Sequence, residues 1–168
     1  HPRRRNIGHN TTEGTREMSD VEARLKHMDA LGVDVHVLYP SVFLRPLTDQ
    51  PHVEIALHRS YNRWMAEIVK KQPDRLRWVL VPPLLSLADK GLMREELKFC
   101  KDNGACGVFM RGLEWDRNVA DPYFYPLYEM ASELDLAICF HSGNNSMVHH
   151  DLLTEDTTFT KFKLAVVG

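Results

Sequence analysis

The chain has 168 residues, of which 43% are apolar and 26% are charged, a composition typical of one folded domain with a hydrophobic core. The 21 basic and 23 acidic residues give a formal charge of -2, which provides no long-range attraction to nucleic acid or to an anionic membrane. No apolar run approaches the roughly 20 residues that cross a bilayer, and the first residues lack the apolar core of a signal peptide. We therefore expect a cytoplasmic protein without nucleic-acid or membrane partners.

Short apolar runs alternate with amphipathic stretches along most of the chain. Apolar residues at helical spacing, set between capping and stop residues, predict helices, and β-branched runs bounded by turns predict strands. In chain order, we expect a helix at 19–32, a strand at 33–40, a helix at 51–72, a strand at 77–84, a helix at 86–104, a strand at 105–113, a helix at 121–135 and a strand at 136–143.

Particular residues mark where the helices begin, end and bury their apolar side. Ser19 or Asp20 is the expected cap of the first helix, Ser86 is the expected cap of the third, and Gly104 ends the third. The second helix should bury one apolar stripe, made of Val53, Leu57, Tyr61, Trp64 and Ile68.

The alternation of strands and helices predicts an α/β fold with a parallel sheet. The sheet could belong to a (β/α)8 TIM barrel or to a small doubly wound sheet, but no strand-to-helix turn carries a phosphate-binding glycine motif. A whole barrel takes roughly 250 residues, so we expect about half of a barrel in a single partial domain. This domain would comprise a loop or arm at 1–18, βα units at 19–143, and a loop with the start of the next helix at 144–168.

One histidine stands where an apolar strand gives way to small polar residues, in "LAICFHSGNNS". Side chains at the carboxyl end of a barrel strand point into the mouth of the barrel, where the imidazole of His141 could bind a metal ion. Its alternative role is a hydrogen bond to a backbone carbonyl. Arg111 ends the preceding strand at the same level, where it could hold a substrate carboxylate or form a structural ion pair.

Other polar residues near the strand ends are weaker candidates. Ser41, after the first strand, and Asn144, after His141, could contact substrate, although a solvated loop or a turn explains them as well. His36 lies inside a strand and is expected to be a core histidine with its hydrogen bonds satisfied. Cys100, Cys106 and Cys139 lack a CxxC spacing and are expected to be small core residues.

Three segments carry a resemblance to a known family: "REMSDVEARLKHMDALGVDVHVLYPS", "YNRWMAEIVKKQPDRLRWVLVPPL" and "DPYFYPLYEMASELDLAICFHSG". They resemble the amidohydrolase-related proteins, often called amidohydrolase family 2, which include aminocarboxymuconate semialdehyde decarboxylase and resorcylate decarboxylase. The resemblance implies a metal-dependent (β/α)8 barrel with its site at the carboxyl ends of the strands.

The family's metal ligands come from several strands, and one of them has a match in this chain. The resemblance implies a ligand pair on the first strand, a histidine ending the fifth, another after the sixth, and an aspartate on the eighth. His141 would be the fifth-strand histidine, so we expect the first strand to precede His1 and the last three to follow Gly168. A catalytic zinc normally takes three protein ligands, so this chain alone should be inactive.

The resemblance leads to three functional hypotheses. The first is a metal-dependent enzyme that decarboxylates a small carboxylic acid without oxidation, with a divalent metal, zinc or manganese, bound by His141 and the substrate charge bound by Arg111. The second is metal-dependent hydrolysis of a lactone, ester or amide. The third is a non-catalytic half barrel that pairs with itself to cover its open strand edges. We expect a homo-oligomer because a four-stranded sheet leaves both outer strands unpaired.

Overall fold

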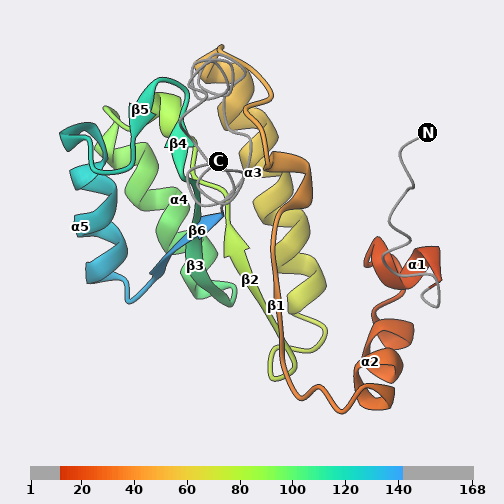
Figure 1. Ribbon diagram of the computed structural model, residues 1–168. Coiled ribbons are helices and arrows are strands. Elements are labelled where there is room, and N and C mark those ends of the chain that lie inside the picture. The colour runs from red at the N-terminus through yellow and green to blue at the C-terminus, as the bar shows by residue number, and fades with distance from the viewer. Residues whose placement is uncertain (1–11, 142–168) are drawn as a thin grey trace, which may run out of the picture.

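The structure, a computed structural model, describes residues 12–141, and four parallel strands form its centre (Figure 1). The strands lie in the order β1 (His36–Leu38), β2 (Leu76–Leu80), β3 (Ala105–Arg111) and β6 (Ala137–His141). All three neighbouring pairs are parallel. The four predicted strands are confirmed with shorter bounds, and the sheet is curled as about half of a (β/α)8 barrel.

Each connection between neighbouring strands of the sheet contains a helix. The helices are α3 (Pro51–Val69), α4 (Lys90–Asp102) and α5 (Tyr125–Glu133). They pack on one face of the sheet and form the main hydrophobic core with it (Figure 1). Within residues 12–141, no helix is both long enough and apolar enough to cross a membrane.

The chain forms further elements outside this layer of helices. Before β1, the chain forms α1 (Glu13–Arg16), inside the segment predicted as a loop, and α2 (Val21–Ala30). Three short 3-10 helices follow: η1 (Ser41–Phe43), η2 (Leu84–Ser86) and η3 (Pro122–Phe124). A small antiparallel hairpin of β4 (Leu113–Glu114) and β5 (Arg117–Asn118), which the sequence did not predict, lies just beyond β3.

Of the two predicted N-terminal caps, that of α2 is confirmed and that of α4 is wrong. The Asp20 carboxylate caps α2 by accepting a hydrogen bond from the Ala23 N–H at 2.9 Å, as predicted. The prediction of Ser86 as the cap of α4 is wrong, because Ser86 belongs to η2 and Asp89 accepts from the Leu92 N–H at 3.0 Å. The helix ends before Gly104, whose φ of +87° suits glycine.

The second face of the sheet carries a smaller apolar cluster of Phe43, Val79, Val81 and Phe109. Gly107 of β3 lets β6 approach closely, because a Cβ at this position would lie 2.5 Å from the Cys139 sulfur and 2.9 Å from the Ala137 carbonyl oxygen. The cysteines agree only in part with their predicted core positions. Cys100 is fully buried, whereas Cys106 and Cys139 are half-buried.

The predicted apolar stripe of α3 is wrong by about one residue. Leu57 and Trp64 are 39% and 47% exposed, and the buried side of the helix is turned by about 100° relative to the prediction. It carries a polar half followed by an apolar half, made of Glu54, His58, Asn62, Met65, Ala66, Ile68 and Val69, and of these only Ile68 belongs to the predicted stripe. The helix therefore presents polar groups to the carboxyl end of the sheet.

Asn62 shows why a polar residue is buried there. Its Oδ1 accepts from the Val81 N–H at 3.0 Å, and its Nδ2 donates to the Val81 carbonyl at 3.0 Å and to Glu96 at 2.9 Å. Val81 follows the last residue of β2, so its backbone groups lie beyond the regular strand. Arg59 and Arg63 also pair with the buried Glu96. Asn62 thus joins the end of β2 to both α3 and α4.

Replacement of Asn62 by alanine should destabilise the protein strongly. The N62A change leaves the Val81 backbone groups and one Glu96 oxygen without this partner, and we expect a loss of about 3 kcal/mol in the free energy of unfolding by urea titration. The exposed Asn118→Ala is the control and should cost less than about 1 kcal/mol. Equal losses in the two variants would contradict the role given to Asn62.

Candidate functional site

His141 and Arg111 lie side by side at the carboxyl ends of two neighbouring strands. The parallel register pairs Arg111 of β3 with His141 of β6, so the prediction that they share one level is confirmed. The His141 ring lies 6.0 Å from the Phe109 ring, on the sheet face that carries the smaller apolar cluster. No residue within 12–141 forms a hydrogen bond with the His141 ring, and no backbone carbonyl in that range accepts one from it.

Arg111 is buried and forms an ion pair with Glu114, an acidic residue that the sequence did not point to. Its Nε donates to Glu114 Oε2 at 2.7 Å, its Nη2 lies 2.5 Å from the same oxygen, and its backbone N–H donates to Oε1 at 2.6 Å. The remaining Nη1 donates to the Phe43 carbonyl at 3.3 Å. Of the two predicted roles for Arg111, the structural ion pair is the one formed in this structure, and substrate binding stays a prediction.

Two further buried side chains, both from α3, hold the loops at this end of the sheet. Glu54 accepts a hydrogen bond from the Leu85 N–H at 2.7 Å, in the loop after β2. His58 Nδ1 lies 2.9 Å from the Pro82 carbonyl, and its ring meets the Phe43 ring edge to face at 4.9 Å. We call Glu54, His58, Arg111 and Glu114 the loop-anchoring cluster, because each of them binds backbone at the carboxyl ends of the strands.

Burial sets the protonation of this cluster. It raises the pKa of Glu54 to about 7, although the Leu85 N–H and the Arg111 charge oppose the shift. Burial lowers the pKa of His58 to about 4, so its imidazole is neutral at pH 7. Burial also raises the pKa of Glu114, against the opposing effect of Arg111. The cluster therefore contains the buried ion pair of Arg111 and Glu114, the neutral imidazole of His58, and the Glu54 carboxyl group, whose pKa is about 7.

Ser41 lies apart from His141, at the first strand of the sheet. It is exposed in η1, two residues before Phe43, and it lines a pocket of about 450 Å³. Arg16 of α1 lines the same pocket, together with three aromatic residues, Tyr39, Tyr61 and Trp64. The pocket borders β1, whose outer edge has no strand partner among residues 12–141. Asn144 lies outside the described residues.

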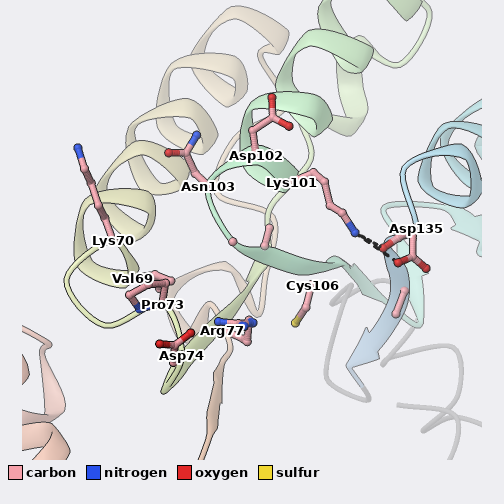
Figure 2. Close-up of a pocket in the computed structure, with 13 residues that line it drawn as sticks. Val69, Lys70, Pro73, Asp74, Arg77, Lys101, Asp102, Asn103, Cys106 and Asp135 are labelled. Carbon is pink, nitrogen blue, oxygen red and sulfur yellow. Dashed lines mark hydrogen bonds and ion pairs between the residues drawn. The ribbon is translucent and has the colours of Figure 1, made fainter.

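A larger pocket, of about 760 Å³, lies at the opposite end of the sheet (Figure 2). It is formed where β2, β3 and β6 begin, and both basic and acidic side chains line it, among them Arg77, Lys101 and Asp135. Lys101 donates to the Asp135 carbonyl at 2.7 Å (Figure 2). In barrel enzymes the active site lies at the carboxyl ends of the strands, so this pocket is not the candidate site.

The described residues supply at most one ligand of the expected metal site. No group of three His, Cys, Asp or Glu side chains within 12–141 is arranged to hold an ion, whereas a catalytic zinc takes three protein ligands. His36 is no substitute, because it is the first residue of β1 and lies at the amino end of that strand, whereas the candidate site is at the carboxyl ends. The prediction that His36 has its hydrogen bonds satisfied also fails within these residues, since its buried Nδ1 has no partner there.

Sequence reasoning missed three members of the loop-anchoring cluster, although it flagged Arg111. Glu114 carries a local signal, because an acid only three residues after an arginine is close enough along the chain to pair with it. Glu54 and His58 are four residues apart on α3, a spacing that places them on one helix face. Which face is buried, however, depends on the backbone groups of the loops that meet it.

The chain is similar to known proteins over most of its length. A family model described as amidohydrolase matches residues 8–168. The solved 2,6-dihydroxybenzoate decarboxylase from Rhizobium is 24% identical with a TM-score of 0.64, over 80% of this chain and 43% of its own. The solved 5-carboxyvanillate decarboxylase LigW from Sphingomonas paucimobilis is 25% identical with a TM-score of 0.59, over 70% and 34%.

A third solved structure contains a metal. It is a dihydroxybenzoic acid decarboxylase from a Polaromonas species with bound manganese and the inhibitor 2-nitroresorcinol, and it is 23% identical with a TM-score of 0.62, over 80% of this chain and 42% of its own. The chain thus spans less than half the length of these three structures. No curated protein matches it significantly.

Replacement of Glu54 by glutamine should change how stability depends on pH. Because the pKa of Glu54 is raised from its ordinary 4.5 to about 7, its contribution to stability is fully present below pH 4.5 and is lost as the pH rises through 7. Glutamine still accepts from the Leu85 N–H but does not ionise. Relative to the parent protein, we expect E54Q to gain roughly 2 kcal/mol between about pH 5 and pH 8 in urea titrations.

The control is Glu67→Gln on the exposed side of the same helix, which should show no such trend. A difference between E54Q and the parent that stays constant with pH would mean that Glu54 is already ionised at pH 5 and would contradict the assignment.

Proposed function

Because the chain belongs to the amidohydrolase family, we propose that the protein is a metal-dependent enzyme that decarboxylates a small carboxylic acid without oxidation. In this reaction the bond between the carboxyl carbon and its neighbour breaks, carbon dioxide leaves, and a proton replaces it on the neighbouring carbon. The observation that carries the proposal is the placement of His141 at the carboxyl end of a strand, in register with Arg111, on a half barrel similar to solved decarboxylases.

We propose a divalent metal as the cofactor, with His141 as one of its ligands. The support is the manganese in one similar decarboxylase together with the half-buried imidazole at a strand end. Imidazole suits zinc, whereas manganese favours carboxylate and water oxygens, so the ligands outside residues 12–141 would decide between the two metals. The other ligands would come from outside residues 12–141.

The proposed substrate is a small aromatic or unsaturated carboxylic acid. The similar decarboxylases are described with dihydroxybenzoates and carboxyvanillate. The proposed contacts from this chain are Ser41 on the β1 side of the mouth and Asn144 just after His141. Arg111 lies nearby, but its ion pair with Glu114 reduces the positive charge that it could offer to a substrate carboxylate.

Hydrolysis of a lactone, ester or amide is the second candidate, favoured by the family's description as amidohydrolase. The two reactions differ in their products. The test incubates the full-length gene product with Mn²⁺ or Zn²⁺ and a panel of hydroxybenzoates, lactones and amides. We expect carbon dioxide in a one-to-one ratio with the acid consumed. Acid release from a lactone or amide without carbon dioxide would refute decarboxylation.

The outer edges of the described sheet support a further proposal, that this chain by itself forms a homo-oligomer. The outer edges of β1 and β6 have no strand partner among residues 12–141. Light scattering of the 168-residue chain tests this proposal, and a monomer would refute it.

Replacement of His141 should remove the metal and the activity together. We expect H141A to lose metal, measured by elemental analysis per chain, and to lower kcat/KM by more than about 100-fold, because even outer-shell partners of a metal cost 10- to 100-fold. The control is the exposed His52→Ala at the start of α3. A metal content in H141A equal to that of the parent would exclude His141 as a ligand.

A further inference from the structure

Arg111 touches two loops that are far apart in the sequence. Through Glu114 it holds the β4–β5 hairpin, and its guanidinium also lies 5.6 Å from the ring of Trp115 in the hairpin turn. Through Nη1 it holds the Phe43 carbonyl, 68 residues away, at the end of η1. These two loops follow β3 and β1, and both border the carboxyl end of the sheet where His141 stands. One side chain therefore fixes the spacing between them.

The Phe43 end of this bridge is itself well supported. The Phe43 ring is 4% exposed and meets the His58 ring at 4.9 Å and the Tyr61 ring at 5.2 Å, both nearly edge to face. These contacts hold Phe43 in place, and its carbonyl accepts the hydrogen bond from Arg111 Nη1 at 3.3 Å. A planar guanidinium can bond Glu114 and this carbonyl together, whereas a lysine ammonium lacks such a fork.

The charge balance argues against direct capture of substrate by Arg111. Its charge is matched by Glu114 within 2.5 Å, and both side chains are almost fully buried. A substrate carboxylate arriving there would meet a neutral pair rather than a free cation. It would also have to displace contacts whose loss leaves Glu114 buried without its partner, which is strongly unfavourable.

We propose that Arg111 and Glu114 act as a positioning pair, which holds the loop after β1 and the β4–β5 hairpin at a fixed separation beside His141 and so aligns the mouth for catalysis. This inference rests on the proposed function for its effect on rate. The fixing of the loops can be measured without any activity.

The test compares R111K, E114Q and the double variant in the full-length protein. The surface variant R94K is the matched control, because Arg94 also pairs with a glutamate at 2.5 Å but is 53% exposed. Three kinds of measurement are made. They are kcat and KM for the hydroxybenzoate of the panel that releases carbon dioxide, hydrogen exchange of the segment 41–47 by mass spectrometry, and the thermal midpoint of unfolding.

We expect R111K and E114Q each to lower kcat by about 10- to 100-fold, the cost of a small misalignment, with KM nearly unchanged. The double variant should lower kcat by no more than either single variant does, because both changes break the same ion pair. Exchange should become faster in 41–47 and in the hairpin but not in α4. R94K should match the parent in all respects.

Two results would overturn the proposal. If Arg111 binds substrate directly, R111K raises KM while E114Q leaves KM, kcat and loop exchange as in the parent. If the pair only stabilises the fold, exchange rises throughout the chain and kcat per folded molecule is unchanged. If the parent protein releases no carbon dioxide, the proposed function fails, but loop exchange still decides whether the pair positions the loops.

Discussion

A row of buried polar side chains on α3 is the constraint on which the carboxyl end of this half barrel depends. Parallel strands end with backbone groups that the sheet no longer pairs, and such groups need partners when they are buried. Glu54, His58 and Asn62 provide these partners at Leu85, Pro82 and Val81. Because the three residues are spaced by four, one helix face binds three backbone groups of the segment 81–85 after β2. These hydrogen bonds hold the segment after β2 against α3.

Arg111 extends this arrangement to the neighbouring strands. The ion pair with Glu114 closes the end of β3, and the bond to the Phe43 carbonyl connects it to the loop after β1. A buried ion pair is weak evidence for stability, since desolvation offsets much of its Coulomb attraction. Its better supported role is geometric: it specifies one arrangement of loops around His141. In many enzymes a rigid scaffold aligns functional loops in this way.

The sequence predicted the order of strands and the level of the candidate site well. The runs ending at Arg111 and His141 are apolar and short, and parallel strands align their carboxyl ends, so the pairing of these two residues could be foreseen. Asp20 and Gly104 mark a helix start and a helix end through local chemistry alone. These features depend on a few neighbouring residues, which is why sequence reasoning reaches them.

The features that could not be foreseen depend on distant backbone groups. The apolar residues Leu57 and Trp64 suggested the buried side of α3, yet that side is set by the needs of Val81 and Leu85, which only the folded chain brings near. The hairpin at Glu114 is too short to carry a strand pattern. Within residues 12–141 no group of three His, Cys, Asp or Glu side chains could hold a metal ion, so the candidate site is one part of the proposed active site.

Backbone hydrogen exchange at three amides tests the central claim most directly. The N–H groups of Val81, Leu85 and Arg111 donate to Asn62, Glu54 and Glu114. If these buried side chains hold the ends of the strands, the three amides exchange as slowly as those inside β2 and β3, measured residue by residue by NMR. Exchange at the rate of an exposed loop would contradict the account.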